Sequence, residues 1–349
     1  MKCCEKTSTE TDTAIAMDRR TAIKGLAGLA IGIAASTSER AYGQATKIRL
    51  AFCGQLLCVV PYEVTRDRGH FKAEGLDLEL VYTRGGNQAM QALVGGAVDY
   101  AGTSLDVALE AFSHGAKIRR IASTGRLPLF ALATGPKAKA GIRALKDLEG
   151  KTVGISGLGN ADHILVLYLM EQAKADPSKV RFAALGTNLY DALRLGQVDA
   201  GMVQEPALSL ILAAGGGVLV NTMDITDADK YLGGAYEFMG VAVRAEERDR
   251  RRDEMRRLAN ALAKGLHDTR TIPVVEIVAA LPKALVAGGD RPQLVAILEK
   301  YRRSLYPDTV RIDPAAAARV AEAHRVAGVA KQPADLKTLL DLSVVTEKS

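Results

Sequence analysis

The sequence contains no tryptophan, and aromatic residues make up only 5% of its 349 residues. A stacking platform for nucleobases or an aromatic cage for a quaternary amine depends on such side chains, so both kinds of site are poorly supported. The net charge is +6, and the basic residues are scattered apart from a cluster at residues 248–257. That cluster is mixed in sign, which is typical of a solvated helix face rather than of a nucleic-acid patch.

Cysteine and histidine are also scarce. Two of the four cysteines, Cys3 and Cys4, lie at the extreme N-terminus, and the other two, Cys53 and Cys58, are separated by four residues. The nearest histidine that follows is His70, so a set of three or four metal ligands is lacking. The five histidines form no recognisable catalytic triad or metal cluster. We therefore predict no metal and no other cofactor. An oxidising compartment would permit a disulfide between Cys53 and Cys58, but spacing alone does not decide it.

Long hydrophobic runs are absent as well. The longest apolar run covers residues 25–35, which as a helix is about 16 Å long and cannot cross a hydrocarbon core of about 30 Å. Basic residues precede this run and small residues follow it, ending in Gly43-Gln44-Ala45, which is the pattern of a signal peptide. We predict that residues 1–45 are removed and that the mature protein is periplasmic.

The export route stays open between two possibilities. Arg19 and Arg20 resemble a twin-arginine signal, although Ala22 stands where such signals usually carry a bulky apolar residue, so ordinary Sec export is the alternative. The first 16 residues lie upstream of Met17 and are either a misplaced start or a cytoplasmic extension.

The most informative feature present is an internal repeat. Residues 92–99 and 192–199 share the pattern A-L-x-x-G-x-V-D, and Gly86 and Gly186 match in the same register. A run of matches at one offset indicates two copies of one structural unit. Gly96 and Gly196 would each end a short helix in the left-handed conformation that glycine adopts without strain.

Each copy predicts the same order of elements. Strands are expected at 48–52 and 76–82 in the first copy and at 152–155 and 180–185 in the second, with a helix after each strand and a third strand opening at Val-Asp. Strands that alternate with helices indicate parallel βα units, whose ligands bind outside the carboxyl ends of the strands.

The segments on either side of the second copy predict how the chain passes between two lobes. Residues 129–134 and 238–244 read as strands and are natural crossings, and the part after residue 246 reads as helices that cover the first lobe. We predict an α/β fold of two lobes, each a βα sheet, with a helical C-terminal extension. Lobe 1 comprises 46–133 plus 240–349, and lobe 2 comprises 134–239.

Several motifs now resemble a known family. Residues 69–76 read G-H-F-K-A-E-G-L, residues 145–154 read L-K-D-L-E-G-K-T-V-G, and Glu205-Pro206 follows the sixth predicted strand. Together with the repeated L-x-x-G-x-V-D, they are similar to the substrate-binding proteins of ABC importers for nitrate, sulfonates, taurine and thiamine-precursor pyrimidines. His70 and Gln204 depart from the aromatic residues common in that family.

The resemblance implies a type II periplasmic binding fold that closes on a small solute. It also implies a partner, an ABC permease with a separate ATPase, to which the protein delivers that solute. We expect a monomer that is not an enzyme and does not bind nucleic acid.

Polar residues in the loops after the strands are the candidate ligand contacts, because helix N-termini there offer free N–H groups and partial positive charge. Ser104 and Asn160 are also natural N-caps, and capping alone could explain them. The predicted substrate-binding residues are Gln55, Leu56, Arg84, Asn87, Thr103, Ser104, Arg126, Ser156, Gly157, Asn160, Gln204 and Glu205.

Charged candidates suggest the ligand's character. Arg84 or Arg126 could pair with a carboxylate or sulfonate, although a surface arginine is the simpler explanation of each. Glu205 would repel a bare inorganic anion and suits a ligand with an N–H donor, unless it only caps the helix that begins at Pro206. We therefore expect a small organic ligand, anionic or zwitterionic.

Other function classes carry weaker signals. Residues 156–162 resemble half of a dinucleotide fingerprint, but Asp162 occupies the third glycine's place. The P-loop pattern is absent, so the chain is not the importer's ATPase. Two alternatives stay open: an enzyme on the same fold related to thiamine-pyrimidine synthesis, which would need more cysteines, and a periplasmic ligand sensor, which would need a signalling partner.

Overall fold

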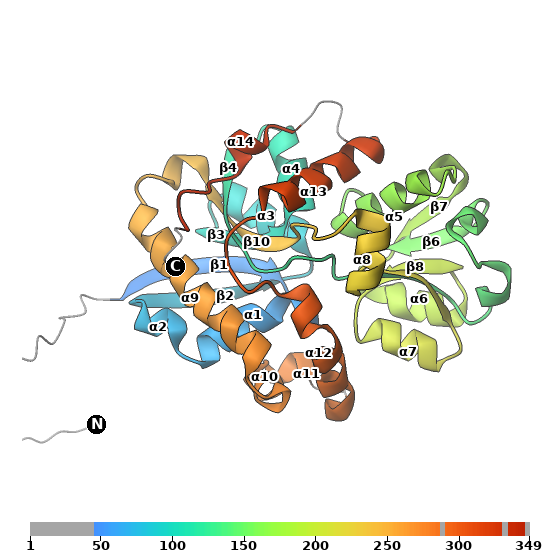
Figure 1. Cartoon of the computed structure of the whole chain (residues 1–349), viewed down its shortest axis with the longest axis horizontal. Coiled ribbons are helices and arrows are strands. Elements are labelled where there is room, and N and C mark those ends of the chain that lie inside the picture. Colours follow the sequence, from blue (N-terminus) through green and yellow to red (C-terminus); the bar gives the residue numbers. More distant parts are fainter. Residues whose placement is uncertain (1–44, 287–289, 330–333, 346–349) are drawn as a thin grey trace, which may run out of the picture. The chain divides into compact units, whose positions relative to one another are not determined.

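The computed structural model describes residues 45–286, 290–329 and 334–345 (Figure 1). The predicted signal peptide, with Arg19, Arg20 and the apolar run 25–35, lies outside the described residues. Within the described ranges, none of the helices combines the length and the apolar character needed to cross a membrane.

The first sheet has the strand order β2-β1-β3-β10-β4. Its strands are Thr46–Cys53 (β1), Leu76–Thr83 (β2), Tyr100–Ser104 (β3), Ile118–Ser123 (β4) and Met239–Arg244 (β10). β1 pairs in parallel with β2 and β3, and β10 is antiparallel to both β3 and β4. β10, which lies between β3 and β4 in this sheet, therefore comes from a segment more than 100 residues further along the chain than β4.

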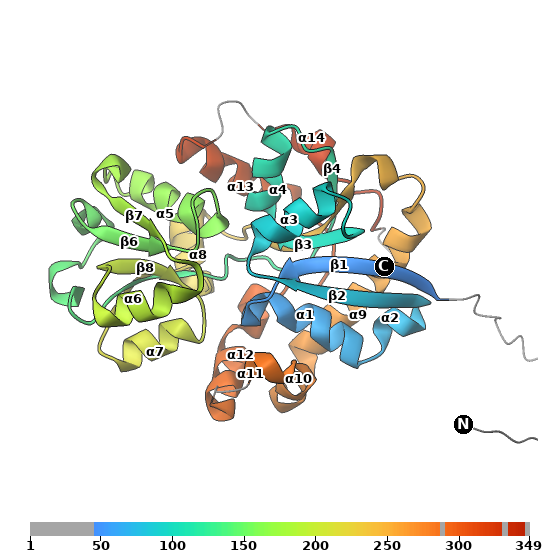
Figure 2. The ribbon, with the colours of Figure 1, turned by 180° about the vertical axis from the view of Figure 1, so that it is seen from behind.

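The second sheet repeats this topology with the order β7-β6-β8-β5-β9, and Figure 2 shows β7, β6 and β8 side by side. Its strands are Ala131–Thr134 (β5), Thr152–Ile155 (β6), Arg181–Ala184 (β7), Ala200–Val203 (β8) and Gly217–Asn221 (β9). β6 is parallel to β7 and β8, and β5 is antiparallel to β8 and β9. The α/β fold with two sheets is confirmed, and each segment predicted as a crossing supplies the antiparallel strand of one sheet.

Helices connect the strands and follow the last of them. The α-helices are Leu56–Asp67 (α1), His70–Ala73 (α2), Gly86–Val94 (α3), Leu105–Ser113 (α4), Ala161–Gln172 (α5), Leu189–Leu195 (α6), Ala207–Ala213 (α7), Ile225–Leu232 (α8), Arg252–Thr271 (α9), Val274–Ala280 (α10), Lys283–Val286 (α11), Arg291–Leu305 (α12), Pro314–Val326 (α13) and Leu336–Leu339 (α14). Short 3-10 turns occupy Lys139–Gly141, Leu145–Leu148, Pro177–Lys179, Gly186–Asn188 and Ala245–Glu247.

The C-terminal helices contact more than the first sheet's elements. α9 packs on α1 and α2, whereas α13 packs on both α4 and α5. In addition, the Asn221 amide of β9 donates to the Tyr301 hydroxyl of α12 at 2.9 Å. The sequence predicted helices that cover lobe 1. In the structure, α12 also contacts β9 of the second sheet, and α13 also contacts α5, the helix that follows β6.

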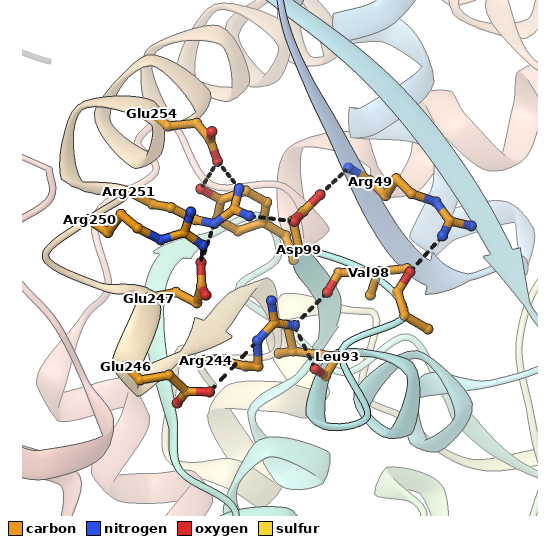
Figure 3. Close-up of polar contacts among 12 residues, drawn as sticks. Arg49, Leu93, Val98, Asp99, Arg244, Glu246, Glu247, Arg250, Arg251 and Glu254 are labelled. Carbon is orange, nitrogen blue, oxygen red and sulfur yellow. Dashed lines mark hydrogen bonds and ion pairs between the residues drawn. The ribbon is translucent and has the colours of Figure 1, made fainter.

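The repeated aspartate has the same structural task in both sheets. Asp99 Oδ2 accepts a hydrogen bond from the Arg49 backbone N–H at 2.8 Å, and Asp199 Oδ2 accepts one from the Thr152 N–H at 2.8 Å. Arg251 also contacts Asp99, at 2.6 Å (Figure 3). Each carboxylate thus satisfies a backbone donor near the start of a central strand, which explains the repeat without a role in ligand binding.

The glycines of the repeat adopt the predicted conformation. Gly96 has a φ of 75° and Gly196 a φ of 74°, both in the left-handed region. Each follows a short helix, α3 or α6, and lets the chain turn directly into the next strand.

Candidate functional site

A cavity of about 460 Å³ lies beside the carboxyl ends of strands from both sheets. Such a volume is typical of a pocket for a small organic molecule. The lining residues are Cys53, Gln55, Cys58, Arg84, Gly85, Gly86, Asn87, Gln88, Thr103, Ser104, Val107, Phe130, Ser156, Gly157, Leu158, Asn160, Ala161, Asp162, Leu185, Gly186, Thr187, Gln204, Phe238 and Met239. Loops that follow β1, β2 and β3 therefore face loops that follow β6, β7 and β8 across one space.

Most of the predicted contact residues meet at this cavity. Nine of the twelve line it: Gln55, Arg84, Asn87, Thr103, Ser104, Ser156, Gly157, Asn160 and Gln204. Leu56 and Glu205 line a second space of about 280 Å³, which shares Gln55, Ser156 and Gln204 with the first. The parallel βα topology brings them together, because equivalent strand ends lie at one edge of each sheet.

Three buried polar atoms in the cavity lining have no hydrogen-bond partner among the described residues: Thr103 Oγ1, Asn160 Oδ1 and Gln204 Oε1. Buried polar groups are nearly always paired in folded proteins, since an orphaned one costs free energy. Asn160 and Gln204 lie in loops of the second sheet, and Thr103 lies near the end of β3 in the first. The arrangement offers unused acceptors and a hydroxyl to a polar ligand.

Asn160, Ser156 and Asp162 form a hydrogen-bonded chain at the start of α5. The Asn160 amide donates to Ser156 Oγ at 2.9 Å, and Ser156 Oγ donates to Asp162 Oδ1 at 2.7 Å. Asp162 Oδ2 also accepts from the Ser156 backbone N–H at 2.5 Å. Asn160 occupies the predicted N-cap position, but its side chain bonds to Ser156 rather than to a backbone N–H of the helix.

Asp162 is fully buried, and burial raises the pKa of its carboxyl to about 6 despite the two hydrogen bonds from Ser156. From the sequence, this aspartate is noticeable only as a departure from the dinucleotide fingerprint. Its position one residue into α5, beside the favourable end of the helix dipole, was the available signal that it could hold Ser156 in place.

Ser104 is an N-cap as predicted. Its side chain accepts from the Val107 N–H at 3.3 Å at the start of α4, and it also lines the cavity. Gly86, the first residue of α3, lies against Thr103 of β3, and a Cβ on Gly86 would be 2.5 Å from Thr103 Oγ1. Glycine is therefore required for the loop after β2 to approach β3 this closely.

The two candidate arginines are in different environments. Arg84 is exposed and lines the cavity. Its backbone N–H donates to Gln88 Oε1 at 3.0 Å, and its guanidinium has no hydrogen bond to the residues that the structure describes. Arg126 lines neither space, and its guanidinium donates to the carbonyls of Ser304 at 2.9 Å and Arg303 at 2.7 Å. Arg126 thus ties the chain to the end of α12, and we leave it out of the proposed site.

Glu205 is buried and bonded within its own segment. Its Oε2 accepts from the Ser209 backbone N–H at 3.0 Å, in the first turn of α7, across a cis peptide bond to Pro206. The hydrogen bond with Tyr301 raises the pKa of Lys300 against the opposing effect of burial, and the negative charge of Glu205 adds a smaller upward contribution. The hydrogen bond from Ser209 therefore supports the explanation that Glu205 caps α7, and a contact between Glu205 and a ligand stays a prediction.

Several residues that line the cavity were not predicted from the sequence. Leu185, Gly186 and Thr187 correspond to Gly85, Gly86 and Asn87 at the repeat offset, so the repeat itself was the signal that could have found them. Phe130 and Phe238 come from the two crossings and meet edge to face with ring centroids 5.9 Å apart, which gives the cavity an apolar wall. Nothing local marked these two rings as neighbours.

A buried arginine contacts Phe238, one of the two residues that form this apolar wall. Arg120 of β4 has no exposed surface, and its guanidinium donates to Thr103 O at 2.7 Å and to Phe238 O at 2.8 Å. Glu237 lies 3.6 Å away as its partner charge. Burial lowers the pKa of Arg120 and raises that of Glu237 to about 7, in each case against the attraction of the other charge.

The described residues contain no group of three or more His, Cys, Asp or Glu side chains that could hold a metal ion. The prediction that the cavity needs neither a metal nor another cofactor stays a prediction.

Comparisons with known proteins give the fold a context. The search of curated proteins returns no match. The structure is similar to that of a protein from Bordetella bronchiseptica RB50, with a TM-score of 0.77 and 23% identity over 86% of this chain and 96% of that one.

Two further similar structures have functional descriptions. One is the ligand-binding component of an ABC-type import system from Staphylococcus aureus, solved with zinc bound, with a TM-score of 0.70 and 17% identity over 87% of this chain and 99% of that one. The other is the periplasmic aliphatic sulphonate-binding protein of Escherichia coli, with a TM-score of 0.66 and 17% identity over 87% and 94%. These likenesses establish the periplasmic-binding-protein fold.

The sequence itself matches one family description, NMT1/THI5 like, over residues 59–274. That stretch begins in α1, contains the whole second sheet and β10, and ends in the C-terminal helices. It includes the repeated segments 92–99 and 192–199 and the cavity-lining loops that follow β2, β3, β6, β7 and β8, but not the loop between β1 and α1. On this match, which covers more than half of its length, the chain belongs to the NMT1/THI5-like family.

Proposed function

We propose that this protein is an exported solute-binding protein that captures a small organic ligand in the 460 Å³ cavity and delivers it to an ABC permease. The observation that carries this proposal is the cavity itself, lined by equivalent strand-end loops of both sheets. The sulphonate-binding and import-system relatives support the role. We also propose the division predicted from the sequence, lobe 1 (46–133 and 240–349) and lobe 2 (134–239), with its two boundaries moved to the starts of β5 and β10. The reason is that β5 (Ala131–Thr134) belongs to the second sheet and β10 (Met239–Arg244) to the first.

The polar groups of the cavity support a ligand with two kinds of ends. Arg84 has an exposed guanidinium that suits a carboxylate or sulfonate. Asn160 Oδ1 and Gln204 Oε1 are buried acceptors without partners among the described residues, and they suit N–H or O–H donors on the ligand. A simple inorganic anion would satisfy the first group and leave the acceptors unpaired, so we propose an anionic or zwitterionic organic solute.

Ligand binding is expected to close the two lobes. A ligand that touches loops of both sheets gains most of its contacts in the closed state, so it shifts the population toward closure. We expect small-angle scattering to record a smaller radius of gyration with ligand than without it. The ligand for this experiment comes from a thermal-shift screen of sulfonates, amino-sulfonates, pyrimidines and small carboxylates. An unchanged radius of gyration at saturating ligand would contradict the closure mechanism.

Export is expected to remove the N-terminal segment. Periplasmic protein should begin near Thr46, the first residue of β1. N-terminal sequencing of protein isolated from the periplasm checks this, and an intact N-terminus on that material would contradict it. Replacing Arg19 and Arg20 with lysine should abolish export only if the twin-arginine route is used.

A further inference from the structure

Two free thiols line the cavity and have no part in the proposed function. Cys53 is the last residue of β1, and Cys58 lies in the first turn of α1. Their side chains are nearly buried, with 7% and 4% of their surface exposed, and both face the cavity. The two cysteines belong to one tight turn, in which the Cys58 backbone N–H donates to the Gln55 carbonyl at 3.0 Å, and their side chains are close enough to interact with each other.

The surroundings make the two thiols unequal. The hydrogen bond from Cys58 lowers the pKa of Cys53, with help from the Gln55 backbone N–H, although burial opposes it. Donation to Cys53, together with burial, raises the pKa of Cys58. A stabilised thiolate beside a second thiol is the arrangement through which a dithiol reacts with an external disulfide, since the thiolate attacks and the neighbour resolves.

We propose that Cys53 and Cys58 are a reversible redox pair whose disulfide closes the loop between β1 and α1 at the wall of the ligand cavity. The Cys53 thiolate attacks a small-molecule disulfide such as oxidised glutathione, which forms a mixed disulfide and releases one thiolate. The Cys58 sulfur then displaces the second thiolate. One external disulfide is broken, one protein disulfide is formed, and the two protein thiol protons pass to the two released thiolates.

Formation of the disulfide is expected to affect ligand binding, because the loop between β1 and α1 forms part of the cavity wall. The loop holds Gln55, which lines both cavity spaces. Oxidation restrains the Gln55 backbone and removes two thiol groups from the lining. The redox state therefore alters the wall that a ligand meets, a consequence that rests on the proposed function.

The short spacing favours a switch over a permanent crosslink. A disulfide stabilises a fold mainly by closing a loop in the unfolded chain, and this effect is small when the loop is short. Only four residues separate Cys53 from Cys58. Both forms are thus expected to fold, which is what a reversible pair requires.

The test uses the intact purified protein and needs no ligand. The protein is equilibrated in mixtures of reduced and oxidised glutathione, quenched in acid, unfolded, alkylated and digested with trypsin. Cys53 and Cys58 fall in one tryptic peptide, residues 50–66, which contains no other cysteine and excludes Cys3 and Cys4. We expect this peptide to become lighter by two hydrogens and to resist alkylation under oxidising conditions, and to recover with dithiothreitol.

Single variants serve as matched controls. Cys53→Ala and Cys58→Ala each leave one thiol in the peptide, which is expected to be alkylated or to carry one glutathione, never to lose two hydrogens. A wild-type peptide that stays doubly alkylated across the whole series would overturn the proposal, as would glutathione on both cysteines without the internal bond. An internal disulfide in a protein that no solute compacts would leave the redox pair standing and reject only the solute-binding role.

Discussion

Replacing Arg120 with methionine is expected to lower the free energy of unfolding at pH 8 by about 3–5 kcal/mol. The variant leaves the buried Glu237 side chain without its partner charge, and it removes the guanidinium hydrogen bonds to the carbonyls of Thr103 and Phe238. The Phe238 carbonyl keeps the hydrogen bond from the Leu105 backbone N–H at 2.8 Å. Denaturant unfolding measures the loss. Because Thr103 and Phe238 line the cavity, we also expect weaker ligand binding at temperatures where the variant is folded.

The pH dependence of this loss tests the Arg120–Glu237 ion pair more specifically than the size of the loss does. Glu237 has a folded-state pKa of about 7, raised above its ordinary value of 4.5. Its stabilising contribution is therefore complete below about pH 4.5 and is lost as the pH rises through 7. Removing Arg120 raises this pKa further, so the difference between variant and wild type should shrink at pH 5 and grow toward pH 8.

Arg119→Met is the matched control, because Arg119 is the preceding residue of β4 and is only partly buried. A surface change of this kind is expected to alter stability by less than about 0.5 kcal/mol. Two outcomes would contradict a supporting role of the Arg120–Glu237 pair. One is that Arg120→Met lowers the free energy of unfolding no more than Arg119→Met does. The other is that its effect is the same at pH 5 and pH 8.

Replacing Arg84 with methionine is expected to weaken binding of the anionic solute roughly 30-fold to several-thousand-fold. The range corresponds to about 2–5 kcal/mol for the loss of one partner of a desolvated charge-assisted contact. Calorimetry with the solute from the thermal-shift screen measures it. The fold should be unaffected to within about 0.5 kcal/mol, since the Arg84 side chain is exposed.

Arg126→Met is the paired experiment, because the sequence suggested both arginines for the same role. Arg126 donates to the carbonyls of Ser304 and Arg303, so its loss is expected to reduce thermal stability and leave the affinity nearly unchanged. The opposite pattern, with affinity lost at Arg126 and kept at Arg84, would contradict the assignment of the anion site. Tight binding of nitrate or sulfate by the wild type would contradict the organic ligand.

Local patterns in the sequence determined the order of elements and the general place of the site. The repeat at 92–99 and 192–199 predicted two equivalent βα units, and the crossings at 129–134 and 238–244 became β5 and β10. These predictions succeeded because strand and helix periodicity and glycine turns act over short stretches of chain. Parallel topology then places the loops after the strands at one edge, which is why nine of the twelve candidates line one cavity.

Only the tertiary structure decided which of those side chains are available to a ligand. Arg84 and Arg126 look equivalent in sequence, but the end of α12 packs beside Arg126 and occupies its donors. Arg120 reads as an ordinary strand arginine and is instead buried against Phe238, a residue 118 positions away. Contacts of this kind depend on how distant segments pack, and no local pattern of charge or hydrophobicity encodes them. The chain alone therefore specifies where the loops meet, while packing between remote segments specifies which groups face the cavity.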